Sequence, residues 1–261
     1  MPTYKPFDWY ATPLYYDIIF DQDTDRETDF LEAVHHQHGQ TRGKQVLEPA
    51  CGSGRLITSL ASRGWKATGI DLSEPMLTFA KQRLSSEHLK ARLLRAPMQD
   101  FRVPGQFDLA HCLVSSFKYL ADENQAADCL RCVCDHLKVG GLFVLGLHLS
   151  DYDQNKLQRE RWVDERAGVH VICNIQSWPA DARTRTERVR SRLIVTENKQ
   201  ETRYETTWDF RTYDLRQLQS LLACEPRLEL VATYNFHHDI DQPINFDGSW
   251  YDNVLILRKK S

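Results

Sequence analysis

The stretch Val46–Arg55, with the sequence VLEPACGSGR, stands between a short apolar run, Lys44–Leu47, and an amphipathic stretch, Arg55–Arg63. The apolar run predicts a strand, and apolar residues at helical spacing followed by Gly64 predict a helix. Two glycines at such a turn let a ligand approach the backbone where a Cβ would clash. The first turn of the helix offers free N–H groups. The stretch therefore predicts a ligand-binding loop at the carboxyl edge of an open α/β sheet.

Strand and helix patterns alternate outward from this loop as far as Leu149. Apolar runs predict strands at Lys66–Ile70, Ala91–Leu94, Phe107–Val114 and Leu142–His148. Helical spacing predicts one helix that starts after Ser73 and another over Asp122–Lys138, ended by Gly140 and Gly141. The last strand is nearly all apolar, which is typical of a parallel sheet covered on both faces. These units predict a doubly wound, Rossmann-like α/β fold with a mostly parallel, seven-stranded sheet.

The pattern changes after Ser150. Period-two alternation predicts antiparallel strands at His170–Trp178, Arg188–Glu197 and Glu201–Arg211. A helix at Asp214–Ala223 and strands at Leu228–Tyr234 and Tyr251–Arg258 then resume the main pattern. We therefore expect one domain made of residues 1–150 and 213–261, with an antiparallel β insertion at 151–212 that caps the substrate site. The free edge of that insertion is a candidate homodimer surface.

Composition excludes several classes of protein. The chain has 261 residues, 41% apolar and 26% charged, with a formal net charge of −3, so disordered, collagenous and disulfide-scaffold classes are excluded. The charge argues against a nucleic-acid partner bound through bulk positive charge. No apolar run is long enough for a membrane span, and Met1–Pro6 lacks the pattern of a signal peptide. Seven cysteines scattered in apolar stretches predict reduced thiols and a cytoplasmic protein without a membrane partner.

Two carboxylates define the expected ligand of the loop. Asp71 ends the second predicted strand, nineteen residues after Gly52, where it can accept both hydroxyls of a ribose. The third glycine of a dinucleotide fingerprint is missing, because Ile57 stands there. Glu48, four residues before Gly52, suits a ligand that carries an ammonium group. A ribose and an ammonium without a diphosphate describe S-adenosylmethionine, and the alternative is a tight turn that binds no ligand.

From about Tyr15 to the C-terminus the chain resembles a class I S-adenosylmethionine-dependent methyltransferase. It is similar to the small-molecule N-methyltransferases of amino sugars and of glycine or sarcosine, which also insert an antiparallel sheet after the fifth strand. The loop at Glu48–Gly54 and Asp71 carry this resemblance, together with Tyr16-Asp17, Met98–Phe101 and Cys112–Phe117.

The resemblance implies a set of cofactor-binding residues, and the chain departs from the family pattern at two positions, Pro97 and Tyr119. The set is Glu48, Ala50, Cys51, Gly52, Ser53, Gly54, Asp71, Leu72, Met76, Pro97, Met98, Gln99 and Leu113, with Leu72 and Met76 against the adenine. Many relatives have an acid at Pro97 that accepts the adenine amino group, so here the backbone of Met98 and Gln99, or Asp100, must serve. The amino-sugar enzymes have a histidine at Tyr119, which leaves the general base and the acceptor type open.

Three candidate catalytic residues surround the expected acceptor site: Tyr16, Tyr119 and His148. The resemblance places Tyr16 in a helical lid over the cofactor. His148 ends the fifth strand, where it is either an acceptor-site residue or a partly buried polar cap. The insertion begins three residues later and can roof the site, and Tyr204 and Trp208 on one strand face could supply apolar walls.

The resulting prediction is methyl transfer from S-adenosylmethionine to a small molecule, most readily an amine. The alternatives are an O-methyltransferase and a non-catalytic S-adenosylmethionine-binding protein. A nucleic-acid methyltransferase would need a basic rim around the cleft, and a nicotinamide oxidoreductase would need room for a diphosphate at the glycine loop.

Other polar groups have structural explanations. Cys129, Cys132 and Cys134 point in different directions on a helix, so no metal site is expected. The acidic residues between Asp21 and Asp29 predict a solvated helix start. A hairpin that turns near Asn198 would set Arg192 beside Glu205 and Arg188 beside Asp209, so cross-strand ion pairs are preferred to a phosphate or nucleic-acid site.

Overall fold

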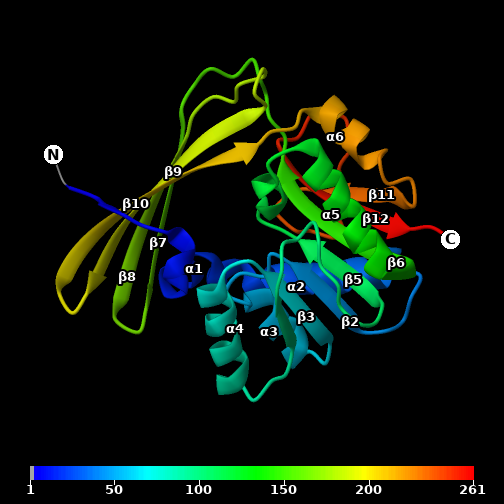
Figure 1. The fold of residues 1–261 in the computed structure, drawn as a ribbon, viewed down its shortest axis with the longest axis horizontal. Coiled ribbons are helices and arrows are strands. Elements are labelled where there is room, and N and C mark those ends of the chain that lie inside the picture. Colours follow the sequence, from blue (N-terminus) through cyan, green and yellow to red (C-terminus); the bar gives the residue numbers. More distant parts are fainter. Residues whose placement is uncertain (1–2) are drawn as a thin grey trace.

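The computed structural model describes residues 3–261, which form a seven-stranded and a five-stranded sheet (Figure 1). The larger sheet has the order β11-β12-β6-β5-β2-β3-β4. Its strands are β2 (Gln45–Pro49), β3 (Lys66–Asp71), β4 (Arg92–Arg95), β5 (Phe107–Cys112), β6 (Leu137–His148), β11 (Leu228–Tyr234) and β12 (Asp252–Lys259). Only β12 runs antiparallel to its neighbours, so the doubly wound, mostly parallel fold is confirmed. The strand order reverses between β2 and β5, which is where such sheets bind ligands.

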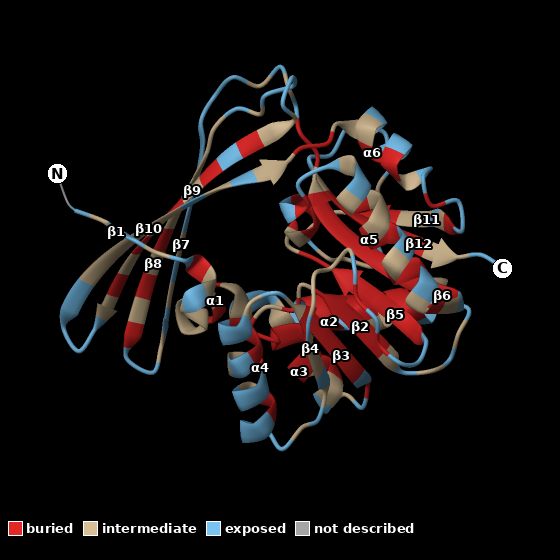
Figure 2. Cartoon of the chain, in the orientation of Figure 1, coloured by how far each residue is buried: buried red, intermediate tan, exposed pale blue. Residues whose placement is uncertain are grey.

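Helices cover both faces of this sheet, whose strands are the most deeply buried part of the chain (Figure 2). They are α2 (Thr24–His38), α3 (Arg55–Ser62), α4 (Glu74–Ser86), α5 (Glu123–His136) and α6 (Leu215–Leu222). One apolar cluster packs α5 and α6 against the sheet, and a second packs α2, α3 and α4. The side chains of Ser73, Asp122 and Asp214 cap α4, α5 and α6, so local sequence fixes where these helices begin.

The end of α5 differs from the sequence expectation. The helix stops at His136 and β6 begins at Leu137, so Gly140 and Gly141 lie inside a strand and do not end the helix. Leu137 already pairs with Phe107 of β5, which draws the backbone into an extended conformation. Gly140 has φ +77° and a Cβ there would lie 2.6 Å from Gln40, so this glycine serves a kink in β6 packed against a neighbouring loop.

The five-stranded sheet has the order β1-β10-β9-β8-β7. Its strands are β1 (Lys5–Pro6), β7 (Gln158–Arg166), β8 (Val169–Ser177), β9 (Thr186–Glu197) and β10 (Gln200–Arg211). The β9–β10 hairpin turns at Asn198 and Lys199, and its register sets Arg192 opposite Glu205 and Arg188 opposite Asp209. Both ion pairs form, with Arg188 Nε 3.0 Å from Asp209 Oδ1, which confirms the predicted pairing. Strands β1 and β7 have no counterpart in the sequence prediction.

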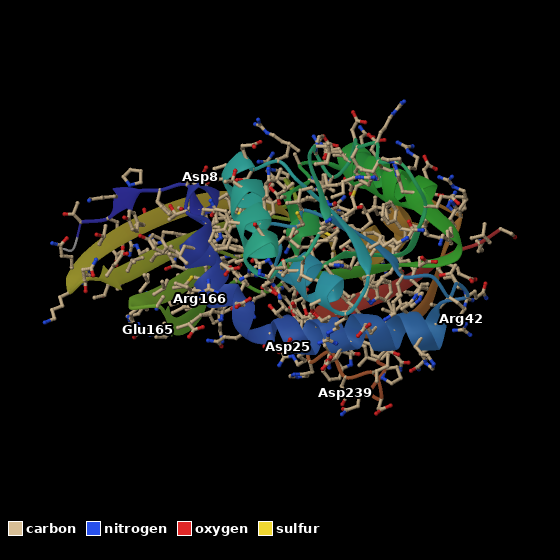
Figure 3. All side chains as sticks on the ribbon, turned by 90° about the horizontal axis from the view of Figure 1, so that it is seen from below. Asp8, Asp25, Arg42, Glu165, Arg166 and Asp239 are labelled. Atoms are coloured by element: carbon tan, nitrogen blue, oxygen red, sulfur yellow. The ribbon has the colours of Figure 1, made fainter. Side chains whose placement is uncertain are left out.

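The N-terminal segment joins the two sheets. It contains two 3-10 turns, η1 (Trp9–Ala11) and η2 (Asp21–Asp23), and the helix α1 (Pro13–Phe20) between them. Trp9, Ile18 and Ile19 pack into an apolar cluster with β8 and β9. The carboxylate of Asp17 is buried and binds Arg83 of α4 and Arg166 of β7 (Figure 3, where Arg166 is labelled). Helix α1 therefore lies against the five-stranded sheet, although β7, the next strand of that sheet along the chain, begins more than a hundred residues later.

Two further expectations concern this end of the chain. The solvated helix start is wrong for Glu27, which is buried and paired with Arg55 at the start of α3. The inference about a signal peptide rests partly on Met1 and Pro2, which lie outside the described residues. Between residues 3 and 261, none of the helices combines the length and apolar character that crossing a membrane requires.

Candidate active site

The glycine loop follows β2 in a series of left-handed backbone conformations. Ala50, Gly52 and Gly54 have φ values of +58°, +53° and +73°. Asp71 at the end of β3 holds the loop, because its Oδ2 accepts a 2.8 Å hydrogen bond from the Gly52 N–H. Its Oδ1 accepts another from the Ser73 N–H at the start of α4. Each carboxylate oxygen keeps a second lone pair, so Asp71 can orient the loop and still accept ribose hydroxyls.

The two glycines have different reasons to lack a side chain. A Cβ on Gly54 would lie 2.7 Å from Cβ of Ala80, so this glycine is required by the packing of α3 against α4. A Cβ on Gly52 would meet only Cε1 of Tyr16, at 3.8 Å. The space above Gly52 is therefore open on the side where a ligand would approach, and Tyr16 forms its far wall.

Glu48 is buried beneath this loop without a hydrogen-bond partner for Oε2 among the described residues. The nearby guanidinium of Arg55 is paired with Glu27, and His111 Nδ1 lies 3.7 Å from Glu48 Oε1. Burial lowers the pKa of His111 to about 3, so this imidazole is neutral and supplies no charge. Burial also raises the pKa of Glu48 well above its ordinary value. A buried carboxylate without a partner is costly, and an ammonium group of a ligand would satisfy it.

The remaining predicted cofactor residues lie around the ends of β3 and β4. The N–H of Ala96 donates to the carbonyl of Asp71, which places Pro97, Met98 and Gln99 beside the end of β3. Leu72 is 61% exposed, whereas Met76 is fully buried, so of the two residues expected against the adenine only Leu72 offers an exposed apolar surface. Of the others, Cys51 and Ser53 are buried in the loop, and Leu113 is buried at the end of β5.

A cavity of about 760 Å³ lies between the carboxyl edge of the larger sheet and the inner face of the smaller one. Four residues predicted for the site line it together: Tyr16, Leu113, Tyr119 and His148. Trp208 also lines the cavity, as expected, but Tyr204 does not. The ring of Tyr204 packs instead against Phe7 and Tyr15, because β1 and α1 cover that end of β10.

The two tyrosines keep their protons at neutral pH. Burial raises the pKa of Tyr119 to about 12 and also raises the pKa of Tyr16. Their rings flank that of Tyr10, at centroid distances of 6.0 and 6.1 Å. Both phenols can therefore donate hydrogen bonds into the cavity, and neither is available as a base.

A polar cluster that sequence reasoning missed lies in the wall of the cavity. Lys118 has no exposed surface, and its Nζ donates to Glu187 Oε2 at 3.1 Å and contacts Nε2 of His148. His148 Nδ1 lies 3.0 Å from Ser115 Oγ. Lys118 belongs to the short helix η3 (Ser116–Tyr119), whereas Glu187 stands on β9. No pattern in the sequence connects Lys118 with Glu187. A lysine inside the largely apolar segment Ser115–Leu120 is itself unusual.

Burial and mutual charge shift the pKa of each member of this cluster. Burial lowers the pKa of Lys118 to about 8. Burial alone would raise the pKa of Glu187, but His148 and Lys118 hold it at about 2. Burial and the charge of Lys118 both lower the pKa of His148. At neutral pH the cluster is therefore a lysine–glutamate ion pair beside a neutral imidazole.

Two other acids in the cavity have no such partner. Glu160 on β7 and Asp252 on β12 both line it, and neither side chain has a hydrogen bond or an ion pair within residues 3–261. Burial raises the pKa of both carboxyls. The aromatic side chains that share the cavity include Trp9, Tyr10, Tyr16, Phe20, Tyr119, Trp162, Trp208, Phe210 and Tyr251. Aromatic faces together with free carboxylates favour a cationic ligand.

The cysteines of α5 lie apart from this site. Cys129 and Cys134 are buried in the core, and Cys132 donates to the carbonyl of Phe101. Across the part of the chain that the structure describes, no three histidine, cysteine or acidic side chains are grouped in a way that could hold a metal ion.

The glycine loop and the part of the larger sheet that surrounds it match a known protein family. Residues 46–141 match the methyltransferase domain family. The putative methyltransferase YqeM of Bacillus subtilis (strain 168) is 33% identical over 126 residues, which are 48% of this chain and 49% of that protein. The chain thus spans about half the length of the curated relatives it matches.

Solved structures match over nearly the whole chain. An S-adenosylmethionine-dependent methyltransferase from Clostridium acetobutylicum ATCC 824 is 20% identical with a TM-score of 0.76, covering 95% of this chain and 97% of that one. The sugar N-methyltransferase KedS8 from Streptoalloteichus sp ATCC 53650 is 20% identical with a TM-score of 0.74, covering 100% and 97%. Residues 46–141 thus resemble a methyltransferase domain, and the chain shares its fold with S-adenosylmethionine-dependent methyltransferases of known structure.

Proposed function

We propose that this protein transfers a methyl group from S-adenosylmethionine to an amine nitrogen of a small molecule. One observation carries the proposal: Tyr16 is the nearest side chain to the open space above Gly52, and the same Tyr16 lines the large cavity. The glycine loop and the cavity therefore adjoin each other at Tyr16. A cofactor on the loop would have its reactive end next to an acceptor in the cavity.

The residues around the loop fit the parts of S-adenosylmethionine. The unpartnered carboxylate of Glu48 suits the ammonium of the methionine moiety, and the free lone pairs of Asp71 suit the ribose hydroxyls. Leu72 and the segment Pro97–Gln99, beside the end of β3, would contact the adenine. When bound, this cofactor supplies an electrophilic methyl group on a sulfonium. The chain itself would bind and orient both reactants and exclude water, which accounts for much of the rate in reactions of this kind.

The lining of the cavity favours an amine over other acceptors. The carboxylates of Glu160 and Asp252 would attract a positively charged amine, and the surrounding aromatic faces would hold it. An amine needs to lose only one proton to become nucleophilic, so a strong general base is not required. KedS8, which has the same fold, is a sugar N-methyltransferase. An O-methyltransferase would require a base close to the acceptor, and since both cavity phenols keep their protons, His148 would have to serve as that base.

The test is a screen of amine, phenol and carboxylate pools with radiolabelled S-adenosylmethionine, preceded by calorimetry of cofactor binding. We expect tight cofactor binding and label transfer into the amine pool. Label in the phenol pool alone would replace the N-methyl proposal with O-methylation. Absence of cofactor binding would overturn the whole proposal.

Two cavity variants test the acceptor side once an acceptor is found. Tyr119→Phe and His148→Ala should lower turnover while S-adenosylmethionine affinity stays within about threefold, because both residues lie on the acceptor side. A loss of about 100-fold or more for His148→Ala would favour a hydroxyl acceptor that needs a base. Full activity in both variants would place the acceptor elsewhere.

A further inference from the structure

We propose that Lys118 is a positioning residue that holds His148 as a neutral imidazole with its proton on Nδ1, and thereby directs the hydroxyl of Ser115 toward the acceptor. The inference rests on the proposed function, because it assigns the acceptor to the cavity. Its structural part concerns only the chain's own hydrogen bonds and is testable without any acceptor.

The hydrogen-bond donors and acceptors around His148 determine which of its ring nitrogens carries the proton. A lysine ammonium has three donors and no acceptor. Lys118 Nζ contacts His148 Nε2, so Nε2 must present its lone pair to the ammonium. The single proton of the neutral ring is then on Nδ1, which donates to Ser115 Oγ at 3.0 Å. The hydroxyl of Ser115 keeps its own proton and one lone pair.

A competing arrangement exists within the same cluster. His148 Nε2 lies 3.3 Å from Glu187 Oε2, a contact that would need the proton on Nε2. Lys118 is closer to the same oxygen, at 3.1 Å, and it can donate to both groups at once. The ammonium therefore takes the place between them and leaves Nε2 without a proton.

The surroundings keep the lysine charged although it is fully buried. Glu187 pairs with it, and its Nζ lies 5.3 Å from the ring centroid of Phe210. Asp252 stands opposite His148 in the β6–β12 register, and Glu160 of β7 lines the same cavity. Tyr251 stacks on the imidazole at 5.0 Å, with a neutral phenol. Lys118 is therefore the cation that faces His148 within residues 3–261, and it opposes protonation of that ring.

The backbone holds Ser115 and Lys118 in register with His148. Val114 and Ser115 both have left-handed φ values, of +54° and +58°. Such a value is unusual for the β-branched Val114 and points to a functional constraint. The Ser115 N–H donates to the carbonyl of Gly146 on β6, and the Lys118 N–H donates to the carbonyl of Ser115. This turn brings Ser115 to Nδ1 and Lys118 to Nε2, on opposite sides of one ring.

Nitrogen-15 NMR of histidine-labelled, cofactor-free protein tests the tautomer directly, with His148→Gln to assign the signals. At pH 7 we expect the wild-type ring to carry its proton on Nδ1. In Lys118→Met the contact to Nε2 is lost and Glu187 becomes the partner of His148. The proton should then move to Nε2, and the pKa of His148 should rise by about one unit or more. A wild-type ring protonated on Nε2, or an unchanged titration in Lys118→Met, would overturn the proposal.

Further variants separate positioning from a loss of folding. Lys118→Arg keeps a charged donor and should retain the wild-type tautomer. The double variant Lys118→Met/Glu187→Gln removes both charges and should leave the pKa of His148 lowered by burial. Lys138→Met, which breaks a pair with Asp108 at the far end of β5, is the matched control and should leave the His148 signals unchanged. A shift of those signals in Lys138→Met as large as in Lys118→Met would refute a specific role.

Activity gives the second readout. In Lys118→Met the acid limb of the kcat/KM profile should move to higher pH by about one unit, because His148 now protonates more readily. Affinity for S-adenosylmethionine should stay within about threefold. An unmoved limb would refute the catalytic consequence. The expected tautomer in a protein that methylates no acceptor would refute only the proposed function, so the two failures are distinguishable.

Discussion

Two buried charge clusters at the carboxyl edge of the larger sheet are balanced in opposite ways. Beneath the glycine loop, Arg55 is paired with Glu27, and the carboxylate of Glu48 is left over. In the cavity wall, Lys118 and Glu187 neutralise each other beside a neutral His148. The first cluster has one acidic side chain whose Oε2 has no partner among the described residues, and an ammonium group of a ligand would supply that partner. The second is complete without a ligand, so it is suited to hold a fixed geometry before the acceptor arrives.

The largest effect should come from closing the space that leads to the first cluster. Gly52→Val adds a branched side chain to a left-handed residue and fills the gap beneath Tyr16. We expect S-adenosylmethionine binding to fall at least about 100-fold by calorimetry, about 2.7 kcal/mol or more. Gly64→Val is the matched control, because Gly64 is also left-handed, at φ +84°, with open space around it. Equal binding losses in both variants would show that strain alone, and not the space above the loop, governs affinity.

Removing the balanced carboxylate should destabilise the fold. Glu187 has its folded pKa lowered from 4.5 to about 2, so its stabilising contribution is present above pH 4.5 and is lost as pH falls toward 2. Glu187→Gln should therefore lower the free energy of unfolding at pH 7 by roughly 1–3 kcal/mol. Urea unfolding at pH 7 and pH 3 measures this difference, which should shrink at pH 3. A variant as stable as wild type at pH 7 would contradict the assigned ion pair.

The same substitution at the unbalanced carboxylate should have the opposite sign. The folded pKa of Glu48 is raised, so its contribution to stability declines as pH rises from its unfolded value of 4.5 through the folded pKa. Glu48→Gln should raise the free energy of unfolding of the cofactor-free protein at pH 8 by about 1 kcal/mol. It should also weaken S-adenosylmethionine binding about ten- to hundredfold, since it removes a charged hydrogen bond. Loss of stability together with unchanged affinity would remove Glu48 from the cofactor site.

Exposed ion pairs should contribute little to stability, in contrast to the two buried clusters. Arg188 and Asp209 form an ion pair on the solvent side of the β9–β10 hairpin, with side chains 62% and 49% exposed. Such pairs are screened by water and salt. We expect Arg188→Gln to change Tm by less than about 3 °C, and by less still in 0.5 M salt. A shift as large as that of Glu187→Gln would mean that exposure does not separate these pairs.

The two sides of the site also differ in how far the sequence could predict them. The glycine loop, Asp71 and the Ser73 cap lie within one strand–helix–strand unit, where spacing along the chain sets spacing in the structure. The register of the β9–β10 hairpin was predictable for the same reason, because a single turn fixes it. The sequence could not predict that Glu48 lacks an ion-pair partner, because this depends on the pairing of Arg55 with Glu27, which belongs to a different helix.

The cavity depends on contacts that no local pattern encodes. Glu187 reaches Lys118 across 69 residues, through the placement of β9 relative to η3. Strand β7 was missed because all its residues except Trp162 and Val163 are polar, so its sequence does not alternate between apolar and polar residues. Tyr204 was wrongly assigned to the cavity because its ring is covered by the segment around β1. The two residues of β1 are too few to show a periodic pattern in the sequence. The residues expected to select the acceptor are therefore the ones that the sequence predicts least well.

The pairing of β1 with β10 has a consequence for the order of events during synthesis. Lys5 pairs with Tyr204 and Pro6 with Glu205, so the first strand of the chain has its partner about two hundred residues later. The strands β2 to β6 pair with one another within about one hundred residues of chain, but β1 cannot pair until β10 has been synthesised. Contacts of such long sequence separation form slowly. A nascent chain would thus acquire its glycine loop early and its enclosed cavity only after β10 has been synthesised.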